Sequence, residues 1–178
     1  MTLERLEHGA YIHAADPGEP GYEGNPPRIS ITEREAQILM SIVAGLEVFE
    51  IGTGIGMATR AMSVTADSVA TCDIDQWVFD NIVPDLPRNV YYEHRDVIDR
   101  DIAVSLITPG WDVVFIDGLH TKEAASRDID LALRFLQPGG RIIFHDTKME
   151  SVQAAIKEAG LRLVIEFDTH YGLGVYES

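Results

Sequence analysis

The sequence of 178 residues has the length of one domain, and 46% of its residues are apolar. Acidic residues outnumber basic residues by 29 to 14, which gives a formal net charge of −15 at pH 7. A charge of this sign repels nucleic acid and anionic membrane surfaces, so we expect neither as a partner. The single cysteine, Cys72, excludes an intramolecular disulfide. With no signal-like leader and no apolar run near the roughly 20 residues that cross a bilayer, the sequence predicts a cytoplasmic protein.

The first 30 residues predict an N-terminal arm or loop, followed by a single folded domain over residues 31–178. Residues 16–27 contain four of the eight prolines and three glycines, a composition that excludes helix and central strand. This stretch is either a poorly ordered entry segment, as is common near chain ends, or a flap over a pocket.

Two capping boxes mark helix starts. Thr32 and Glu35 predict a first helix that ends at Gly45, and Thr147 and Glu150 predict a later one. Between them, residues 121–136 have a helical apolar face and are followed by Pro-Gly-Gly.

Short apolar runs alternate with these helical stretches. Two runs near the end, residues 161–167 and 172–176, are close enough to pair as a hairpin. The alternation predicts an α/β fold: a doubly wound, Rossmann-like, mostly parallel sheet with helices on both faces and a C-terminal antiparallel hairpin. The remaining strands are expected at residues 48–51, 69–72, 90–92, 113–116 and 142–144.

A glycine-rich turn follows the first of these strands, in Glu50-Ile51-Gly52-Thr53-Gly54-Ile55-Gly56. A dinucleotide fingerprint would need its third glycine at position 57, where Met57 stands, and no G-K-[ST] follows for a phosphate loop. The pattern Glu50-x-Gly52-x-Gly54-x-Gly56 resembles motif I of the class I S-adenosylmethionine-dependent methyltransferases. The resemblance implies that this loop, Thr53 included, packs against the amino-acid portion and the sugar of S-adenosylmethionine.

Three aspartates extend the candidate cofactor site. Asp73 ends the next strand, where an acidic side chain accepts hydrogen bonds from ribose hydroxyls, and Asp75 is an alternative for that role. Asp96 matches the acidic residue that the family places near the adenine amino group. Each aspartate taken alone is equally compatible with a strand-end cap or a surface charge.

A second group of polar residues follows the last two parallel strands. Asp117 and His120 follow one strand, and His145 and Asp146 end the other. The segment 111–146 resembles the O-methyltransferase branch that contains sugar- and antibiotic-tailoring enzymes. The resemblance implies that Asp117, His145 and Asp146 hold Mg²⁺ or Mn²⁺, with Asp117 also beside the cofactor, and that His120 is a general base. The alternative is a metal-free turn in which the aspartate caps the loop and the histidine packs locally.

Taken together, these patterns predict methyl transfer from S-adenosylmethionine to a small-molecule acceptor, at a hydroxyl oxygen and with possible metal assistance. The alternatives are a non-catalytic S-adenosylmethionine-binding module and a nucleotide-dependent oxidoreductase on the same fold. His170 and Tyr171 are expected in a plain hairpin loop, although they could line the same pocket. A homodimer is expected only by analogy with relatives.

Overall fold

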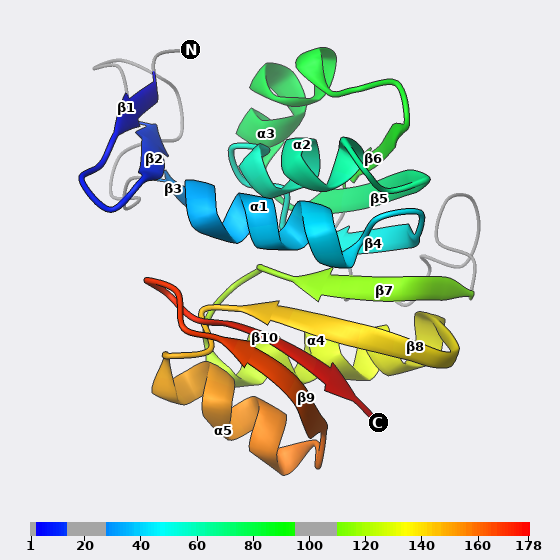
Figure 1. The fold of residues 1–178 in the computed structure, drawn as a ribbon. Helices are drawn as coiled ribbons and strands as arrows, with labels where there is room; N and C mark the ends of the chain where they lie inside the picture. The colour runs from blue at the N-terminus through cyan, green and yellow to red at the C-terminus, as the bar shows by residue number, and fades with distance from the viewer. Residues whose placement is uncertain (1–2, 14–27, 95–109) are drawn as a thin grey trace.

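The main body of the protein is one large sheet. The computed structural model describes residues 3–13, 28–94 and 110–178 (Figure 1). The strands of the main sheet are β4 (Glu47–Ile51), β5 (Ser68–Asp73), β6 (Val90–His94), β7 (Trp111–Ile116), β8 (Leu136–His145), β9 (Arg162–Phe167) and β10 (Leu173–Glu177). They form a seven-stranded sheet in the order β6-β5-β4-β7-β8-β10-β9. Strands β6, β5, β4, β7 and β8 are parallel, whereas β10 is antiparallel to both β8 and β9, so the predicted sheet with a C-terminal hairpin is confirmed.

Helices cover both faces of this sheet, as predicted. Figure 1 shows α1 and α2 on one side and α4 and α5 on the other. The helices are α1 (Glu33–Ile42), α2 (Met57–Ser63), α3 (Gln76–Asn81), α4 (Lys122–Phe135) and α5 (Glu150–Glu158), with a short 3₁₀ turn at Val83–Asp85.

The strand alternation explains how one sheet supports two cores. Phe49 and Val114 pack with α4 and α5, whereas their neighbours Val48 and Phe115 pack with α1 and α2. Successive side chains of a strand point to opposite faces, so nearly continuous apolar runs are what a sheet covered on both faces requires.

The first capping box is confirmed. Thr32 is the N-cap of α1: its hydroxyl accepts from the Glu35 backbone N–H, and the Glu35 carboxylate accepts from the Thr32 N–H at 2.7 Å. The second capping box is wrong. Helix α5 begins at Glu150 with Met149 as its N-cap, and the buried Thr147 hydroxyl has no hydrogen-bond partner among the described residues. The chain turns first at Asp146, in the left-handed region at φ 56°, which displaces Thr147 from the cap position.

The N-terminal region also differs from the prediction of an arm or loop. It contains a small antiparallel sheet in the order β1-β2-β3, made of β1 (Leu3–Arg5), β2 (Ala10–His13) and β3 (Arg28–Thr32). Strands of three to five residues are too short to show a clear alternation in the sequence. Residues 16–27, predicted as a segment or flap, lie outside the described residues.

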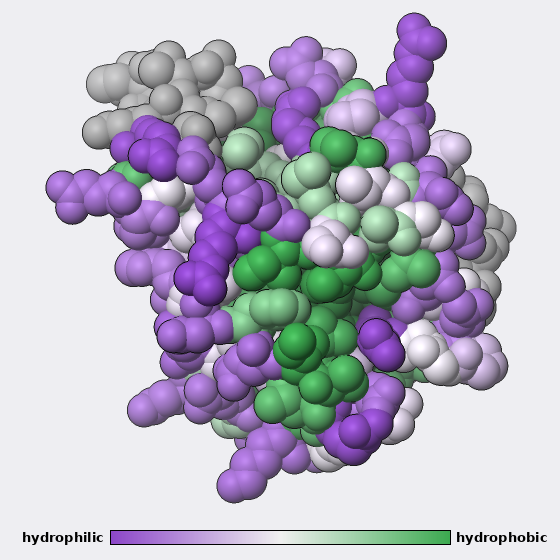
Figure 2. Space-filling model, viewed as in Figure 1, coloured by the Kyte–Doolittle hydropathy of each residue, from purple (hydrophilic) through white to green (hydrophobic). Residues whose placement is uncertain are grey.

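On the face that Figure 2 shows, apolar side chains gather over one part of the main sheet. They cover the part of the molecule where β10 and β9 lie in Figure 1. Leu163, Val164 and Ile165 of the edge strand β9 are 46%, 39% and 46% exposed. Among the described helices, none combines the length and apolarity needed to cross a membrane.

Thr32 caps a helix and Thr147 does not, so replacing each by valine should change the free energy of unfolding by different amounts. Thr32→Val removes the capping hydroxyl and should lower the free energy of unfolding by about 1 kcal/mol. Thr147→Val removes a hydroxyl without a partner, so stability should stay within about 0.5 kcal/mol or rise. Urea unfolding of both variants tests this, and equal losses for the two would contradict the assigned cap.

Candidate functional site

The loop after β4 is built around a close approach of two strand ends. Gly52 has φ +96°, and a Cβ atom there would lie 2.2 Å from the Asp117 carbonyl oxygen. The Asp117 N–H donates to the Ile51 carbonyl at 2.9 Å, which ties β7 to β4 at the same point. Only glycine fits such a position, because both the backbone angle and the lack of space exclude a side chain.

The rest of the loop is fixed by hydrogen bonds to β5. The Thr53 hydroxyl lies 2.7 Å from that of Thr71, and the Gly54 N–H donates to the Asp73 carboxylate at 2.9 Å. Gly54 has φ +52°, yet no other part of the described protein lies within 4 Å of a Cβ built there. Gly56, at φ +76°, is the N-cap of α2. The loop is thus rigid but open above Gly54, as a cofactor cradle must be.

The acidic residues after β5 have different roles. One Asp73 oxygen accepts from Gly54 and the other from the Asp75 N–H at 2.9 Å, which leaves further lone pairs for a ligand. Asp75 caps α3 by accepting from the Trp77 N–H. Asp75 therefore has a structural role as the N-cap of α3. Asp96 lies outside the described residues.

Glu50 does not face the pocket. Its side chain is completely buried, and one carboxyl oxygen accepts from the Thr59 hydroxyl of α2 at 2.5 Å. Burial raises the pKa of Glu50 to about 8, with the nearby carboxylates of Asp117 and Asp73 adding to the effect. A neutral Glu50 therefore joins β4 to α2 and acts on the cofactor loop only through the backbone.

A pocket of about 310 Å³ lies over the carboxyl ends of β4, β7 and β8. Ligands bind at this edge in doubly wound folds. Its lining combines the glycine loop with the residues after β7 and β8 and with two N-terminal residues: Ser30, Ile31, Gly52, Thr53, Gly54, Ile55, Met57, Ala58, Asp117, His120, His145, Asp146 and Tyr171.

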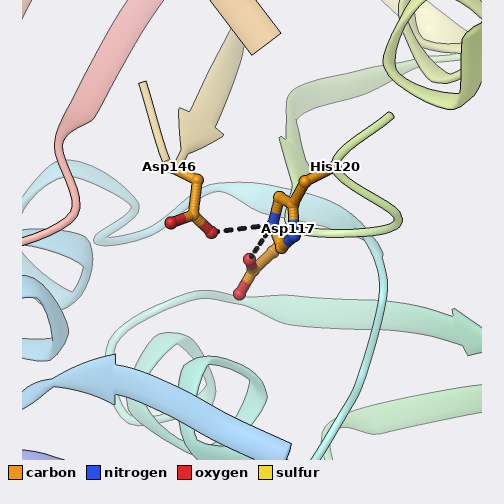
Figure 3. A group of neighbouring side chains, drawn as sticks. All are labelled: Asp117, His120 and Asp146. Carbon is orange, nitrogen blue, oxygen red and sulfur yellow. Dashed lines mark ion pairs between the residues drawn. The ribbon is translucent and has the colours of Figure 1, made fainter. Parts of the chain in front are cut away.

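Two carboxylates and one imidazole converge in this pocket (Figure 3). His120 Nε2 lies 2.7 Å from Asp146 Oδ2 and 3.7 Å from Asp117 Oδ1. Each of the three offers one ligand atom, and these atoms lie within 4.8 Å of one another. Although the contact with Asp146 is short, His120 Nε2 makes no directed hydrogen bond to a described residue. The two carboxylate oxygens and the imidazole nitrogen are therefore close enough together to contact the same bound ion or ligand.

His145 lies behind this group and is held from both sides. Its Nδ1 lies 3.0 Å from Asp117 Oδ1 and 2.9 Å from Asp146 Oδ2, whereas Nε2 lies 3.3 Å from the fully buried Glu35. The resemblance implied that Asp117, His145 and Asp146 hold a metal and that His120 is a general base. In the structure, His120 converges with Asp117 and Asp146 in the pocket, and the buried His145 links Asp117 and Asp146 to Glu35.

The charges of the cluster stabilise one another. Burial alone would raise the pKa of Asp117, but His145 and His120 hold it below its ordinary value. The close carboxylates of Asp117 and Asp146 raise the pKa of His120 to about 9. Burial would lower the pKa of His145, yet Asp117 and its other acidic neighbours raise it well above its ordinary value. Without a bound cation, both imidazoles are therefore protonated at neutral pH.

Sequence patterns missed part of the site. Glu35 was identified only as a capping residue. Tyr171 was expected in a plain loop, with the pocket as the alternative, and it lines the pocket. Ser30 and Ile31 carried no chemical signal at all. Ser30 and Ile31 reach the pocket through the N-terminal sheet, and Tyr171 reaches it through the β9–β10 connection. The hairpin itself was predicted, but no local pattern shows that its connection meets the pocket.

The fold and the glycine loop define a class I, S-adenosylmethionine-dependent methyltransferase. The sequence matches the family described as a methyltransferase domain over residues 49–147, more than half of the chain. The chain belongs to that family.

Solved structures of three methyltransferases share the fold. An O-methyltransferase from Bacillus cereus, in complex with SAH, has a TM-score of 0.68 and 17% identity over 84% of this chain and 83% of that one. The N-methyltransferase NodS from Bradyrhizobium japonicum, also with SAH, has a TM-score of 0.64 and 16% identity over 80% and 85%. A tRNA methyltransferase from Aquifex aeolicus has a TM-score of 0.66 and 15% identity over 84% and 70%. At these identities the likeness establishes the fold and leaves the acceptor open.

The buried Glu50 predicts a specific pH dependence of stability. Its folded-state pKa of about 8 lies above the ordinary 4.5, so the folded protein keeps a proton that the unfolded chain releases between these values. The stabilisation from this group is complete below about pH 4.5 and is lost as the pH rises towards 8.

Glu50→Gln is uncharged throughout and serves as the reference. The unfolding free energy of the wild type minus that of Glu50→Gln should fall by up to about 1.4 kcal/mol per pH unit across this window. Urea unfolding at several pH values measures it. A difference that does not change with pH would show that Glu50 is not a neutral buried acid.

Proposed function

We propose that this methyltransferase transfers the methyl group of S-adenosylmethionine to a hydroxyl oxygen of a small-molecule acceptor, with a divalent cation held between Asp117 and Asp146. The observation that carries the proposal is the convergence of Asp117, His120 and Asp146 in the pocket that the glycine loop lines.

The cofactor end of the pocket is assigned to the glycine loop and Asp73. The open space above Gly54 admits a ligand against the backbone, and Asp73 retains acceptor capacity for ribose hydroxyls. Thr53 lines the pocket, while Glu50 supports the loop from below. Asp96 is expected near the adenine.

The donor set fits a divalent cation. Asp117 and Asp146 each offer a carboxylate oxygen, and these oxygens lie within 4.8 Å of each other, close enough for both to reach one divalent cation. Carboxylate oxygens suit both Mg²⁺ and Mn²⁺. Asp146 adopts φ 56°, a conformation that aspartate tolerates and that functional sites commonly contain.

The reaction requires that the acceptor oxygen be aligned with the methyl group and that the oxygen lose its proton. The methyl carbon leaves the sulfonium sulfur as its bond to the acceptor oxygen forms, and the oxygen loses its proton to His120 Nε2. A cation bound there would lower the pKa of the acceptor hydroxyl. Its positive charge would also oppose the protonation of His120, whose pKa of about 9 otherwise keeps the imidazole from accepting a proton at neutral pH.

Acceptor chemistry separates this proposal from its rivals. The relatives include an N-methyltransferase and a tRNA methyltransferase. The net charge of −15 disfavours RNA, because the phosphate backbone would be repelled. Amine methylation needs no cation to activate the nucleophile, so the paired carboxylates favour a hydroxyl acceptor.

The cofactor assignment predicts the effect of one substitution. Asp73→Asn weakens acceptance from both ribose hydroxyls, so affinity for S-adenosylhomocysteine should fall by about tenfold or more. Asp75→Asn is the matched control, because asparagine caps helices nearly as well as aspartate, and its affinity should stay within about twofold. Isothermal titration calorimetry measures both. Equal losses would contradict the assignment of Asp73.

The metal and base assignments predict that Asp117 and Asp146 variants lose Mn²⁺ binding, whereas a His120 variant keeps Mn²⁺ binding and loses turnover. Mn²⁺ binding, followed by electron paramagnetic resonance, should weaken by about tenfold or more in Asp117→Asn and Asp146→Asn. His120→Ala should keep its Mn²⁺ affinity within about threefold but lose most of its turnover, about 10²-fold. Turnover is the transfer of radiolabelled methyl to a panel of neutral polyhydroxyl compounds, with the product identified by mass spectrometry.

Two results would overturn these assignments. Loss of Mn²⁺ affinity in His120→Ala would make His120 a ligand instead of a base. Methylation of amines but not hydroxyls, unaffected by metal chelation, would contradict the proposed O-methyl transfer.

A further inference from the structure

We propose that Tyr171, held in place by His8, forms the wall of an acceptor subsite that takes a neutral molecule with one apolar face and one hydroxylated edge. This rests on the proposed function, since it concerns the acceptor of the same pocket. It also gives the N-terminal sheet a part in substrate binding.

The pocket extends beyond the cofactor loop. Its far side is lined by Ile31 of β3, by Met57 at the start of α2 and by Tyr171 between β9 and β10. Asp117 and Asp146 line the same pocket. An acceptor oxygen directed at these carboxylates leaves the rest of the molecule against the apolar side.

Contacts on three sides fix the Tyr171 side chain. Its hydroxyl lies 2.7 Å from His8 Nε2, and its ring meets that of His145 edge-on with centroids 5.4 Å apart. His8 in turn stacks on His170 at 4.0 Å, and the His170 ring stands nearly perpendicular to that of Tyr171. These contacts hold Tyr171 in one orientation, so little side-chain entropy remains to be lost when an acceptor binds against it.

The turn that carries His8 is itself anchored. Arg5 donates to the Glu33 carboxylate through two hydrogen bonds of 2.8 Å and 2.9 Å, and the Glu33 N–H donates to the Gly9 carbonyl at 3.1 Å. Glu33 begins α1, the helix whose Glu35 contacts His145. The N-terminal sheet is therefore attached to the same helix that supports the catalytic cluster.

The lining determines the charge of the acceptor. No Lys or Arg is among the described residues that line the pocket, whereas Asp117 and Asp146 are. An anionic acceptor would bring a further negative charge next to these carboxylates. It would find no unpaired cationic side chain among the described lining residues, because His120 and His145 already contact Asp117 and Asp146. The apolar side chains of Ile31, Met57 and Tyr171 favour a flat or ring-shaped apolar face.

Binding of two probes tests the subsite. Catechol is neutral with an apolar ring and two hydroxyls, and 3,4-dihydroxybenzoate adds a carboxylate to the same framework. Affinities are measured by NMR titration of protein saturated with S-adenosylhomocysteine and Mg²⁺. The wild type should bind catechol about fivefold or more tightly than 3,4-dihydroxybenzoate.

Variants of Tyr171 and His8 distinguish the contribution of the Tyr171 ring from that of the contact that holds it in place. Tyr171→Ala should weaken catechol binding by about tenfold, whereas Tyr171→Phe and His8→Ala, which release the ring without removing it, should weaken it by about threefold. Tyr91→Ala is the matched control, because Tyr91 is 51% exposed and does not line the pocket; its catechol affinity should not change. S-Adenosylhomocysteine affinity should stay within about twofold in all four.

The outcomes distinguish the subsite from the proposed function. Unchanged catechol affinity in Tyr171→Phe and His8→Ala, equal affinity for the two probes, or no probe binding to a protein that binds S-adenosylhomocysteine would overturn the subsite alone. Failure of the wild type to bind S-adenosylhomocysteine would overturn the proposed function itself. Should Tyr171→Ala unfold, as thermal unfolding would reveal, the other two variants still decide the question.

Discussion

The contact between the ends of β4 and β7 is the constraint on which the rest of the site depends. Gly52 approaches the Asp117 carbonyl so closely that a single methyl group on its Cα would lie 2.2 Å from the oxygen. The backbone hydrogen bond from Asp117 to Ile51 holds the two ends together. Because of this contact, the loop that starts at Gly52 and the side chain of Asp117 line one pocket. A methyl donor bound on the loop is therefore brought to the acidic cluster by backbone geometry alone.

The acidic cluster illustrates how a fold keeps several charges partly buried. Glu35, Asp117 and Asp146 have lowered pKa values, while His120 and His145 have raised ones, so all five are ionised at neutral pH. Buried charges are tolerated when they are paired. Three negative against two positive charges leave the site with a net negative charge. That imbalance favours the binding of a divalent cation, so the electrostatics of the pocket and its proposed chemistry agree.

Much of the fold could be predicted because its signals are local. The capping box at Thr32 and the apolar runs of the buried strands can each be recognised from a few consecutive residues, and the structure contains both. The spacing at Thr147 failed because it ignores the left-handed turn at Asp146, which moves the start of α5. The glycine loop was identifiable because only glycine suits the angles and the lack of space at Gly52.

The site was predicted in part, for a related reason. Asp117, His120, His145 and Asp146 end adjacent parallel strands, and adjacent strand ends must meet at one edge of the sheet. Which histidine converges with the two carboxylates in the pocket and which links them to Glu35 depends on side-chain directions that no spacing encodes. The roles of Tyr171 and His8 depend on contacts between residues 163 positions apart, which sequence periodicity cannot reveal.

The central claim is that the glycine loop places the methyl donor against the cluster of Asp117, His120 and Asp146. A crystal structure with S-adenosylhomocysteine bound tests it most directly. We expect the ribose hydroxyls on Asp73 and the sulfur directed towards His120 and Asp146. A sulfur directed away from these residues, with no path from it to the cluster, would contradict the claim.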